Sequence, residues 1–305
     1  MENAKPPFSE WIQDHVFSAT ELENYLACPY RFWAQHYLAI KPQNQWTIEI
    51  SPMERGILLH RVLEKVLQVS SASLENLQSK AFSFLEHELS SLKTQYPTLS
   101  PFLLSRQNES LKRTLKNFLT LFLEEKEKRQ SLLPKYFEWS FGHQTPALEI
   151  KNLHGEKILF KGRIDRIDID PVQKTFLIID YKTSGGTTGS QILAGHSFQL
   201  PLYILAVKKL LLPDYEPIGA LYYNLASLEQ KDGLLHTDRL PDFIDLHPSS
   251  STLVPPAMWD RFFEETEVKI AEIISQIRQG DFPSEKEPCQ DYCPYQEICQ
   301  LRSSL

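Results

Sequence analysis

The sequence contains no hydrophobic run that approaches the roughly 20 residues needed to cross a bilayer, so we expect no membrane partner. Residues 1–10 lack the basic-then-apolar pattern of a secretory signal, and we therefore expect a cytoplasmic protein. A Gly-x-x-x-x-Gly-Lys-Ser/Thr phosphate loop is also absent, which argues that the chain is not itself a helicase.

Positive charge is in short supply, with 32 Lys and Arg against 39 Asp and Glu and a net charge of −7 at pH 7. This balance counts against a large nucleic-acid-binding surface. The net charge does not exclude a local basic groove, because Lys112, Arg113 and Lys116 lie close together in the sequence, as do Lys208 and Lys209. Each group taken alone is better explained as a solvated helix face.

Length and periodicity favour one main α/β domain with elaborations. The chain has 305 residues, enough for a large core, and 42% are hydrophobic. Apolar periodicity and breaking residues predict a mixed central sheet flanked by helices. The expected helices are 17–35 with a break at Pro29, 53–69, an inserted helical region 73–130, 198–212 and 259–278; the expected strands are 136–142, 157–168, 175–182 and 218–225, with loops at 184–189 and 229–256.

The most informative segments are two apolar-rich runs that each deliver a carboxylate. Asp165 lies in the first run, and Asp180 and Lys182 close the second. Residues i and i+2 of a strand point to the same face, so Asp180 and Lys182 are expected to face one pocket. A short turn at 170–173 predicts an antiparallel pair that brings Asp165 to the same pocket. Two carboxylates and an ammonium can bind Mg²⁺ or Mn²⁺ and hydrolyse a phosphodiester.

Each of these candidates has a plainer explanation. An exposed Asp–Lys pair is possible, but Asp and Lys are poor strand formers and here they close a buried Phe-Leu-Ile-Ile run. His60 shares a helix face with Glu64, and a lone helix histidine is more often structural. Gln199 and Tyr203 stand one turn apart, which on its own fits a phosphate contact and an amphipathic helix equally well.

The four cysteines form a one-plus-three arrangement. Cys28 stands alone, whereas the other three follow a Cys-x₃-Cys-x₅-Cys pattern at Cys289, Cys293 and Cys299. Disulfides are disfavoured without an export signal. Zinc sites usually use paired Cys-x-x-Cys knuckles, and four thiolates can also hold a [4Fe–4S] cluster. The spacing favours a cluster over zinc only moderately.

Taken together, these motifs resemble the PD-(D/E)XK nuclease superfamily, in particular its RecB/AddB-like nuclease domains. The resemblance runs from residue 17 to residue 299 and rests on four motifs in order and on the cysteines: Gly56-Ile-Leu-Leu-His60, Gly162-Arg-Ile-Asp165, Asp180-Tyr-Lys182 and Gln199-Leu-Pro-Leu-Tyr203. Ile179 stands where the family name has proline, a departure that many members share. The resemblance implies a restriction-endonuclease-like core in a nuclease domain at 17–299, with residues 73–130 as a helical insertion.

The resemblance also implies roles for individual residues. The family's metal ligands map to His60, Asp165, Asp180 and the backbone carbonyl of Tyr181, its catalytic lysine to Lys182, and its Gln-x-x-x-Tyr motif to Gln199 and Tyr203. Glu64 and Asp168 receive no role. The cysteines correspond to a structural [4Fe–4S] cluster in which Cys28 and the segment 280–299 staple the two ends of the domain together.

These correspondences imply a Mg²⁺- or Mn²⁺-dependent DNA nuclease. We expect an exonuclease that acts on single-stranded ends in double-strand break repair, either free-standing or as the nuclease module of an AddB-like protein with an AddA-like helicase partner. One alternative is an iron–sulfur exonuclease of the CRISPR-adaptation type, although the insertion at 73–130 is long for such enzymes. Another is a non-catalytic DNA-binding scaffold, which has no need for the like-charged pair of Asp165 and Asp180.

Overall fold

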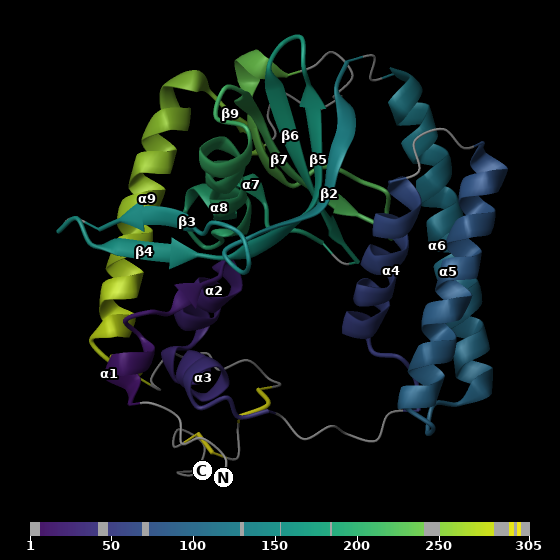
Figure 1. The fold of residues 1–305 in the computed structure, drawn as a ribbon, viewed down its shortest axis with the longest axis horizontal. Coiled ribbons are helices and arrows are strands. Elements are labelled where there is room, and N and C mark those ends of the chain that lie inside the picture. The colour runs from purple at the N-terminus through teal and green to yellow at the C-terminus, as the bar shows by residue number, and fades with distance from the viewer. Residues whose placement is uncertain are drawn as a thin grey trace.

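A mixed six-stranded sheet forms the centre of the computed structural model (Figure 1). The structure describes residues 7–41, 48–68, 73–128, 131–152, 154–183, 185–240, 251–283, 293–295 and 298–299. The strand order confirms the predicted α/β class with a mixed sheet: β2 (Leu133–Phe141), β5 (Gly162–Asp170), β6 (Thr175–Lys182), β7 (Glu216–Asn224), β8 (Gly233–His236) and β9 (Leu253–Val254).

The strands β5 and β6 form the predicted antiparallel pair, and β6 then runs parallel to β7. The turn between β5 and β6 is closed by the side chain of Asp170. Its carboxylate accepts hydrogen bonds from the backbone N–H groups of Val172 and Gln173, at 2.8 and 2.9 Å. Short polar side chains stabilise turns in this way, which explains why the chain reverses here.

Side chains of β6 alternate between two separate cores. Phe176 and Ile178 face one core, and Leu177 and Ile179 face the other. The first core is closed by α2 (Ala19–Ala27), α8 (Gln199–Ala206) and α9 (Pro256–Arg278), and the second by α4 (Pro52–Leu67), α5 (Leu74–Gln95) and α6 (Pro101–Lys128). Figure 1 shows these two helical layers on opposite sides of the sheet. A strand buried on both faces has continuous apolar sequence, as 176–179 does.

The single strand predicted at 157–168 is two strands in two sheets. The first half is β4 (Lys157–Phe160), which joins β1 (Val16–Phe17) and β3 (Leu148–Lys151) in a small three-stranded sheet. The chain leaves that sheet at Lys161, whose N–H donates to the carbonyl of Phe17 at 2.7 Å. A Cβ at Gly162 would lie 2.7 Å from the ring of Phe141, so only glycine fits at this crossing.

The region 229–256, predicted as loop, contains the two short strands β8 and β9. Leu234 and Leu235 are fully buried and pair with β7 and with the segment before β9, which outweighs the polar composition around them. Residues 241–250 lie outside the described part. The remaining short elements are α1 (Phe8–Trp11), α3 (Pro29–Phe32), α7 (Gly189–Leu193), two π-helical turns (Trp33–Tyr37 and Val207–Leu211) and a 3₁₀ turn (Thr237–Arg239).

The first predicted helix, 17–35, begins with the expected capping box and then divides at Cys28. Ser18 accepts a hydrogen bond from the Glu21 N–H, and Glu21 accepts one from the Ser18 N–H. Cys28 is extended, with φ −164°, and serves as the last cap of α2 and the first cap of α3. Proline at 29 disfavours the helical conformation for the residue before it, which places the break at the cysteine.

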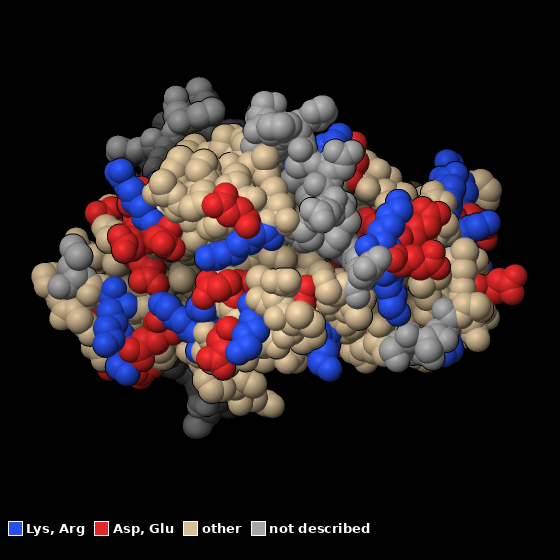
Figure 2. All heavy atoms as spheres, turned by 90° about the horizontal axis from the view of Figure 1, so that it is seen from above, with Lys and Arg blue, Asp and Glu red and all other residues tan. Residues whose placement is uncertain are grey.

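Three lysines of the two basic groups, Lys112, Lys208 and Lys209, are paired with acids. Among the described residues, Lys112 bonds Glu86 at 2.7 Å and Lys208 bonds Glu216 at 2.8 Å. Figure 2 shows basic and acidic side chains interleaved on one face of the molecule, in keeping with the net charge of −7. None of the described helices combines the length and apolar character required to traverse a bilayer.

Candidate active site

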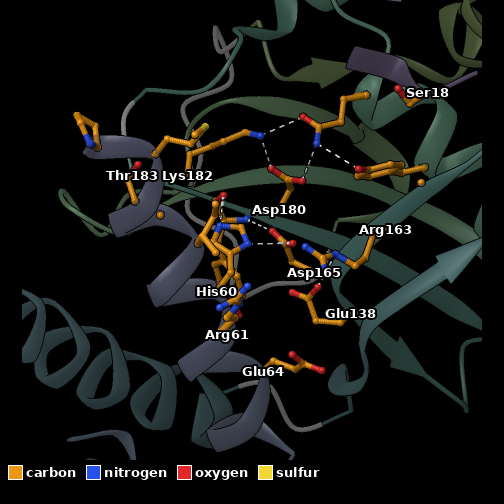
Figure 3. Close-up of a pocket in the computed structure, with 18 residues that line it drawn as sticks. Ser18, His60, Arg61, Glu64, Glu138, Arg163, Asp165, Asp180, Lys182 and Thr183 are labelled. Atoms are coloured by element: carbon orange, nitrogen blue, oxygen red, sulfur yellow. Dashed lines mark hydrogen bonds and ion pairs between the residues drawn. The ribbon is translucent and has the colours of Figure 1, made fainter. Parts of the chain in front are cut away.

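Asp165 and Asp180 meet where β5 and β6 stop pairing. The pairing ends with Arg166 opposite Ile179, so the two aspartates come directly after the paired segment. They open into a cavity of about 690 Å³ that is also lined by α4 and α8 (Figure 3). The end of a strand pair leaves side chains free to converge on a common space, and here both are carboxylates.

On one side of the cavity, α4 places the imidazole of His60 against β5 and β6. Its Nδ1 lies 3.2 Å from Asp165 Oδ1, and its Nε2 lies 3.0 Å from the Tyr181 carbonyl oxygen. Asp165 Oδ2 in turn accepts a hydrogen bond from the Tyr181 N–H at 2.7 Å. Burial opposes a charge on the ring, but the hydrogen bond and charge of Asp165, with further help from Asp180, raise the pKa of His60.

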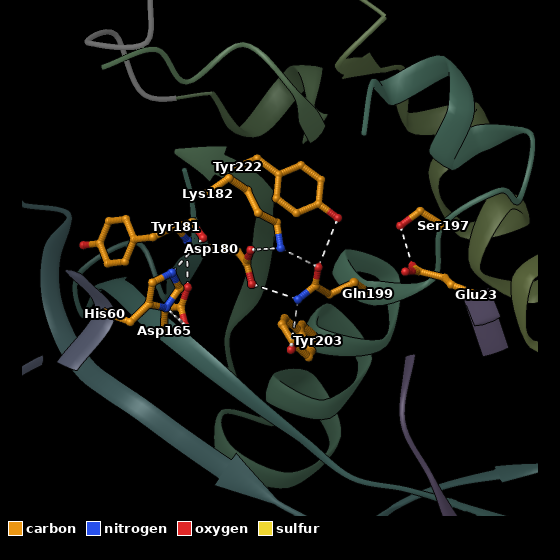
Figure 4. A network of polar contacts seen from close by, with 10 residues as sticks. All are labelled: Glu23, His60, Asp165, Asp180, Tyr181, Lys182, Ser197, Gln199, Tyr203 and Tyr222. Carbon is orange, nitrogen blue, oxygen red and sulfur yellow. Dashed lines mark hydrogen bonds and ion pairs between the residues drawn. The ribbon is translucent and has the colours of Figure 1, made fainter. Parts of the chain in front are cut away.

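On the other side of the cavity, one amide holds the aspartate and the lysine together. Lys182 Nζ lies 2.7 Å from Asp180 Oδ2 and donates to Gln199 Oε1 at 3.0 Å. Gln199 Nε2 donates to Asp180 Oδ1 at 3.0 Å and to the Tyr203 hydroxyl at 3.2 Å. Figure 4 shows this closed network of donors and acceptors. Gln199 therefore fixes the position of both charged groups from the first residue of α8.

Two buried carboxylates in one cavity repel each other. Asp180 is 2% exposed, and burial together with the negative charge of Asp165 raises its pKa to about 6. Lys182 and His60 oppose this shift without cancelling it. A cation placed between the carboxylates would relieve the repulsion.

The structure adds Glu138, which the sequence did not single out. A ligand atom each from Glu138, His60 and Asp165 lies within 4.8 Å of the others. Burial and the charge of Asp165 raise the pKa of Glu138 to about 7, although Arg163 lies only 2.8 Å away. These three side chains could hold a divalent metal ion.

A signal for Glu138 was present in the sequence. It is a lone carboxylate in the predicted strand 136–142, flanked by aromatic residues. The pairs Phe137–Arg166 and Trp139–Ile164 set it opposite Asp165. Its backbone has φ +49°, a conformation that a non-glycine residue rarely adopts and that often marks a functional position. The register of β2 against β5 is needed to see this, and sequence alone does not provide it.

A family model for the PD-(D/E)XK nuclease superfamily matches residues 16–300. The chain belongs to this superfamily. It is similar to one of the subunits of the ATP-dependent helicase/deoxyribonuclease of Caldanaerobacter subterraneus subsp. tengcongensis, with 25% identity over 96% of this chain and 30% of the relative. The protein of the same name from Clostridium acetobutylicum is 24% identical over 93% of this chain and 30% of the relative. The protein of this name from Geobacillus thermodenitrificans is 29% identical over 68% of this chain and 19% of the relative.

The PD-(D/E)XK chain therefore spans less than a third of the length of these relatives.

The two carboxylates to which the family resemblance gives no role, Glu64 and Asp168, lie in different places. Glu64 lines the cavity below His60 (Figure 3). Asp168 lies on the other face of β5, fully buried, and binds the Arg166 guanidinium with two hydrogen bonds. Asp168 is thus outside the cavity.

The three cysteines that the structure describes lie away from the cavity of this PD-(D/E)XK domain. Cys28, Cys293 and Cys299 are half-buried free thiols, and Cys289 lies outside the described residues. Burial, followed by the charges of Cys299 and Cys28, raises the pKa of Tyr30, so both thiols lie near that phenol. The Tyr30 hydroxyl donates to the Ile298 carbonyl at 2.6 Å. The two ends of the chain thus meet at α3.

Proposed function

We propose that this chain is a metal-dependent DNA nuclease that hydrolyses phosphodiester bonds. The observation that carries the proposal is the convergence of Asp165, Asp180, Lys182 and His60 in one cavity, with donor and acceptor atoms 2.7–3.2 Å apart. A charged and hydrogen-bonded constellation of this kind is costly to bury, and it matches the needs of phosphodiester hydrolysis.

The residues present fit Mg²⁺ or Mn²⁺. His60, Asp165, Asp180 and the carbonyl of Tyr181 would hold the ion, and Glu138 stands beside them as a further oxygen donor. Carboxylate and carbonyl oxygens with one imidazole suit these ions. Burial and the charge of Asp165 raise the pKa of Asp180 to about 6 and that of Glu138 to about 7, and a bound cation would offset both effects. When bound, the ion lowers the pKa of water and neutralises phosphate charge.

The protein side chains supply the remaining steps. Lys182 Nζ, held by Asp180 and Gln199, can donate to the attacking water and to the pentavalent phosphate. The Gln199 amide keeps the ammonium from swinging out of the cavity, and Tyr203 anchors that amide from the next turn of α8. His60 and Tyr181 hold Asp165 in place from the opposite side.

The relatives support a more specific role. Their name joins an ATP-dependent helicase to a deoxyribonuclease, and almost all of this chain aligns with 30% of the first two. We propose that the chain corresponds to the nuclease module of such a protein and digests single-stranded DNA ends in double-strand break repair. A helicase partner of the AddA type would then supply part of the DNA grip that a net charge of −7 does not favour.

A cleavage assay on end-labelled linear and on circular single-stranded DNA tests this proposal. We expect linear DNA to be degraded with Mg²⁺ or Mn²⁺, and activity to disappear with a chelator and return with added metal. Circles should survive, because an exonuclease needs an end. Cleavage of circles would replace the exonuclease assignment with an endonuclease. Chelator-resistant cleavage, or no cleavage of either substrate, would refute the metal-dependent nuclease.

We also propose that Cys28, Cys289, Cys293 and Cys299 hold a structural [4Fe–4S] cluster. Three hydrogen bonds already join the ends of the chain: Tyr25 to the Asp281 carbonyl at 2.8 Å, Tyr30 to that of Ile298 at 2.6 Å and Tyr295 to that of Ile40 at 3.1 Å. A cluster there would close a loop of nearly the whole chain, and its binding energy would add to folding.

Protein purified without oxygen should be brown and contain about four iron and four sulfide per chain. Cys28→Ser is expected to lose the iron and to lower the melting temperature, because one of four ligands is gone. Metal analysis and thermal unfolding measure both effects. A colourless protein with one zinc per chain, or a Cys28→Ser variant that keeps its melting temperature, would contradict the cluster.

A further inference from the structure

Glu23 contacts the start of the helix that carries Gln199, although it lies on a different helix and outside the cavity. Its Oε1 accepts hydrogen bonds from the Ser197 hydroxyl at 2.7 Å and from the Phe198 N–H at 3.0 Å. Figure 4 shows Glu23 on α2 reaching across to Ser197, beyond the network around Asp180. Ser197 and Phe198 are buried, so neither donor has free access to water.

The helix α8 has no side-chain cap of its own. Its N-cap residue is Phe198, which cannot accept a hydrogen bond through its side chain. The first N–H groups of a helix need acceptors, and a negative charge near them is favourable. Glu23 supplies an acceptor and a charge just ahead of the first turn. Loss of this contact would leave the buried Phe198 N–H without its acceptor and free the start of α8 to shift.

The residue that follows this contact is Gln199, the first residue of α8. Its two amide atoms hold Asp180 and Lys182, each at 3.0 Å. The bonded path therefore runs from the Glu23 carboxylate through the backbone of Phe198 to the amide of Gln199 and on to the ammonium of Lys182. Only one peptide unit separates the anchored N–H from the residue that orients the lysine.

The helix α2 is itself firmly held. Its first turn is closed by the capping box of Ser18 and Glu21, and its Tyr25 hydroxyl donates to the Asp281 carbonyl after α9 at 2.8 Å. An anchor is useful only if it does not move, and Glu23 lies between these two attachments. The contact thus fixes the start of α8 relative to α2.

We propose that Glu23 is a positioning residue for cleavage: it fixes the start of α8 so that Gln199 holds Lys182 in reach of the reacting phosphate. The proposal rests on the nuclease function proposed above. Glu23 is not among the residues that line the cavity, so its loss should lower the rate of the bound complex and leave affinity for DNA unchanged.

Steady-state cleavage of end-labelled single-stranded DNA by purified variants tests this role. Glu23→Ala is expected to lower kcat by about 10- to 100-fold, where the upper figure is the cost of a catalytic group misplaced by about 1 Å, with KM within about twofold of wild type. Glu23→Gln should recover most of the rate, because its amide oxygen can still accept from Ser197 and Phe198. Glu272→Ala, an exposed acid on α9, is the matched control and should behave as wild type.

A double variant separates positioning from general stability. Adding Glu23→Ala to Gln199→Ala should lower kcat no further, because Gln199 is the residue through which Glu23 acts. Multiplied losses in the double variant would overturn the proposal, as would a wild-type kcat for Glu23→Ala or an equal loss for Glu23→Gln. An inactive wild type would instead refute the nuclease function itself.

Discussion

Lys182→Ala is expected to lower kcat by about 10³-fold, and Asp180→Ala should lower it by at least as much. The lysine is the positive side chain that Gln199 and Asp180 hold in the cavity, at 3.0 and 2.7 Å. Its ammonium acts on charge that develops only as the phosphate is attacked, so its loss affects the rate more than substrate binding. Single-turnover cleavage with saturating Mg²⁺ measures the effect.

DNA binding by these variants should be retained, as measured by fluorescence anisotropy with Ca²⁺ in place of Mg²⁺. Lys231→Ala removes an exposed lysine outside the cavity and is the control, with unchanged kcat expected. Glu138→Gln should raise the Mg²⁺ concentration needed for half-maximal rate, since it removes charge next to His60 and Asp165. Retained cleavage in both Lys182→Ala and Asp180→Ala would refute this active site.

Asp168→Asn is expected to lower the free energy of unfolding by about 3–5 kcal/mol, the usual effect of breaking a buried ion pair. Arg166 and Asp168 are 1% and 0% exposed, and two hydrogen bonds of 2.6 and 2.5 Å join them. The guanidinium also lies over the ring of Phe122, with 5.0 Å to its centre. Without the carboxylate charge, the guanidinium stays buried and lacks its counter-charge.

Urea unfolding followed by circular dichroism measures this loss. Arg261 and Glu265 form an exposed pair on α9, so Arg261→Ala should leave the unfolding midpoint unchanged. The double variant Arg166→Met/Asp168→Leu should recover much of the lost stability, because it removes both charges together. An Asp168→Asn protein with a wild-type midpoint would show that the pair adds nothing to the fold.

The local pattern was sufficient to place several residues of the site. The spacing of Asp180 and Lys182 predicts a common face because side chains of a strand alternate, and both line the cavity. Gln199 and Tyr203 are one helical turn apart, and the structure joins them by a hydrogen bond. The position of His60 followed only from the family resemblance, because one helical histidine carries no local signal.

Other features depend on contacts between distant parts of the chain. Glu138 meets Asp165 only through the register of β2 against β5, which no local pattern fixes. At Gly162 the chain crosses from one sheet to the other, close against the ring of Phe141. Because this contact joins residues that are distant in sequence, the local pattern shows residues 157–168 as one strand. Asp168 lies three residues after Asp165, so strand alternation places it on the opposite face. Its burial against Arg166 beneath α6 depends on the packing of that helix, which no local pattern shows.

The two sides of Tyr181 belong to different parts of the molecule. Its backbone N–H and C=O contact Asp165 and His60, while its ring packs against Phe118 of α6 and Tyr223 of β7, with centres 5.5 and 6.0 Å apart. A substitution at Phe118 would therefore shift the peptide groups whose N–H and C=O hold Asp165 and His60 in the cavity. Changes to the packing of α6 that aim at stability would therefore also change the geometry of the proposed active site.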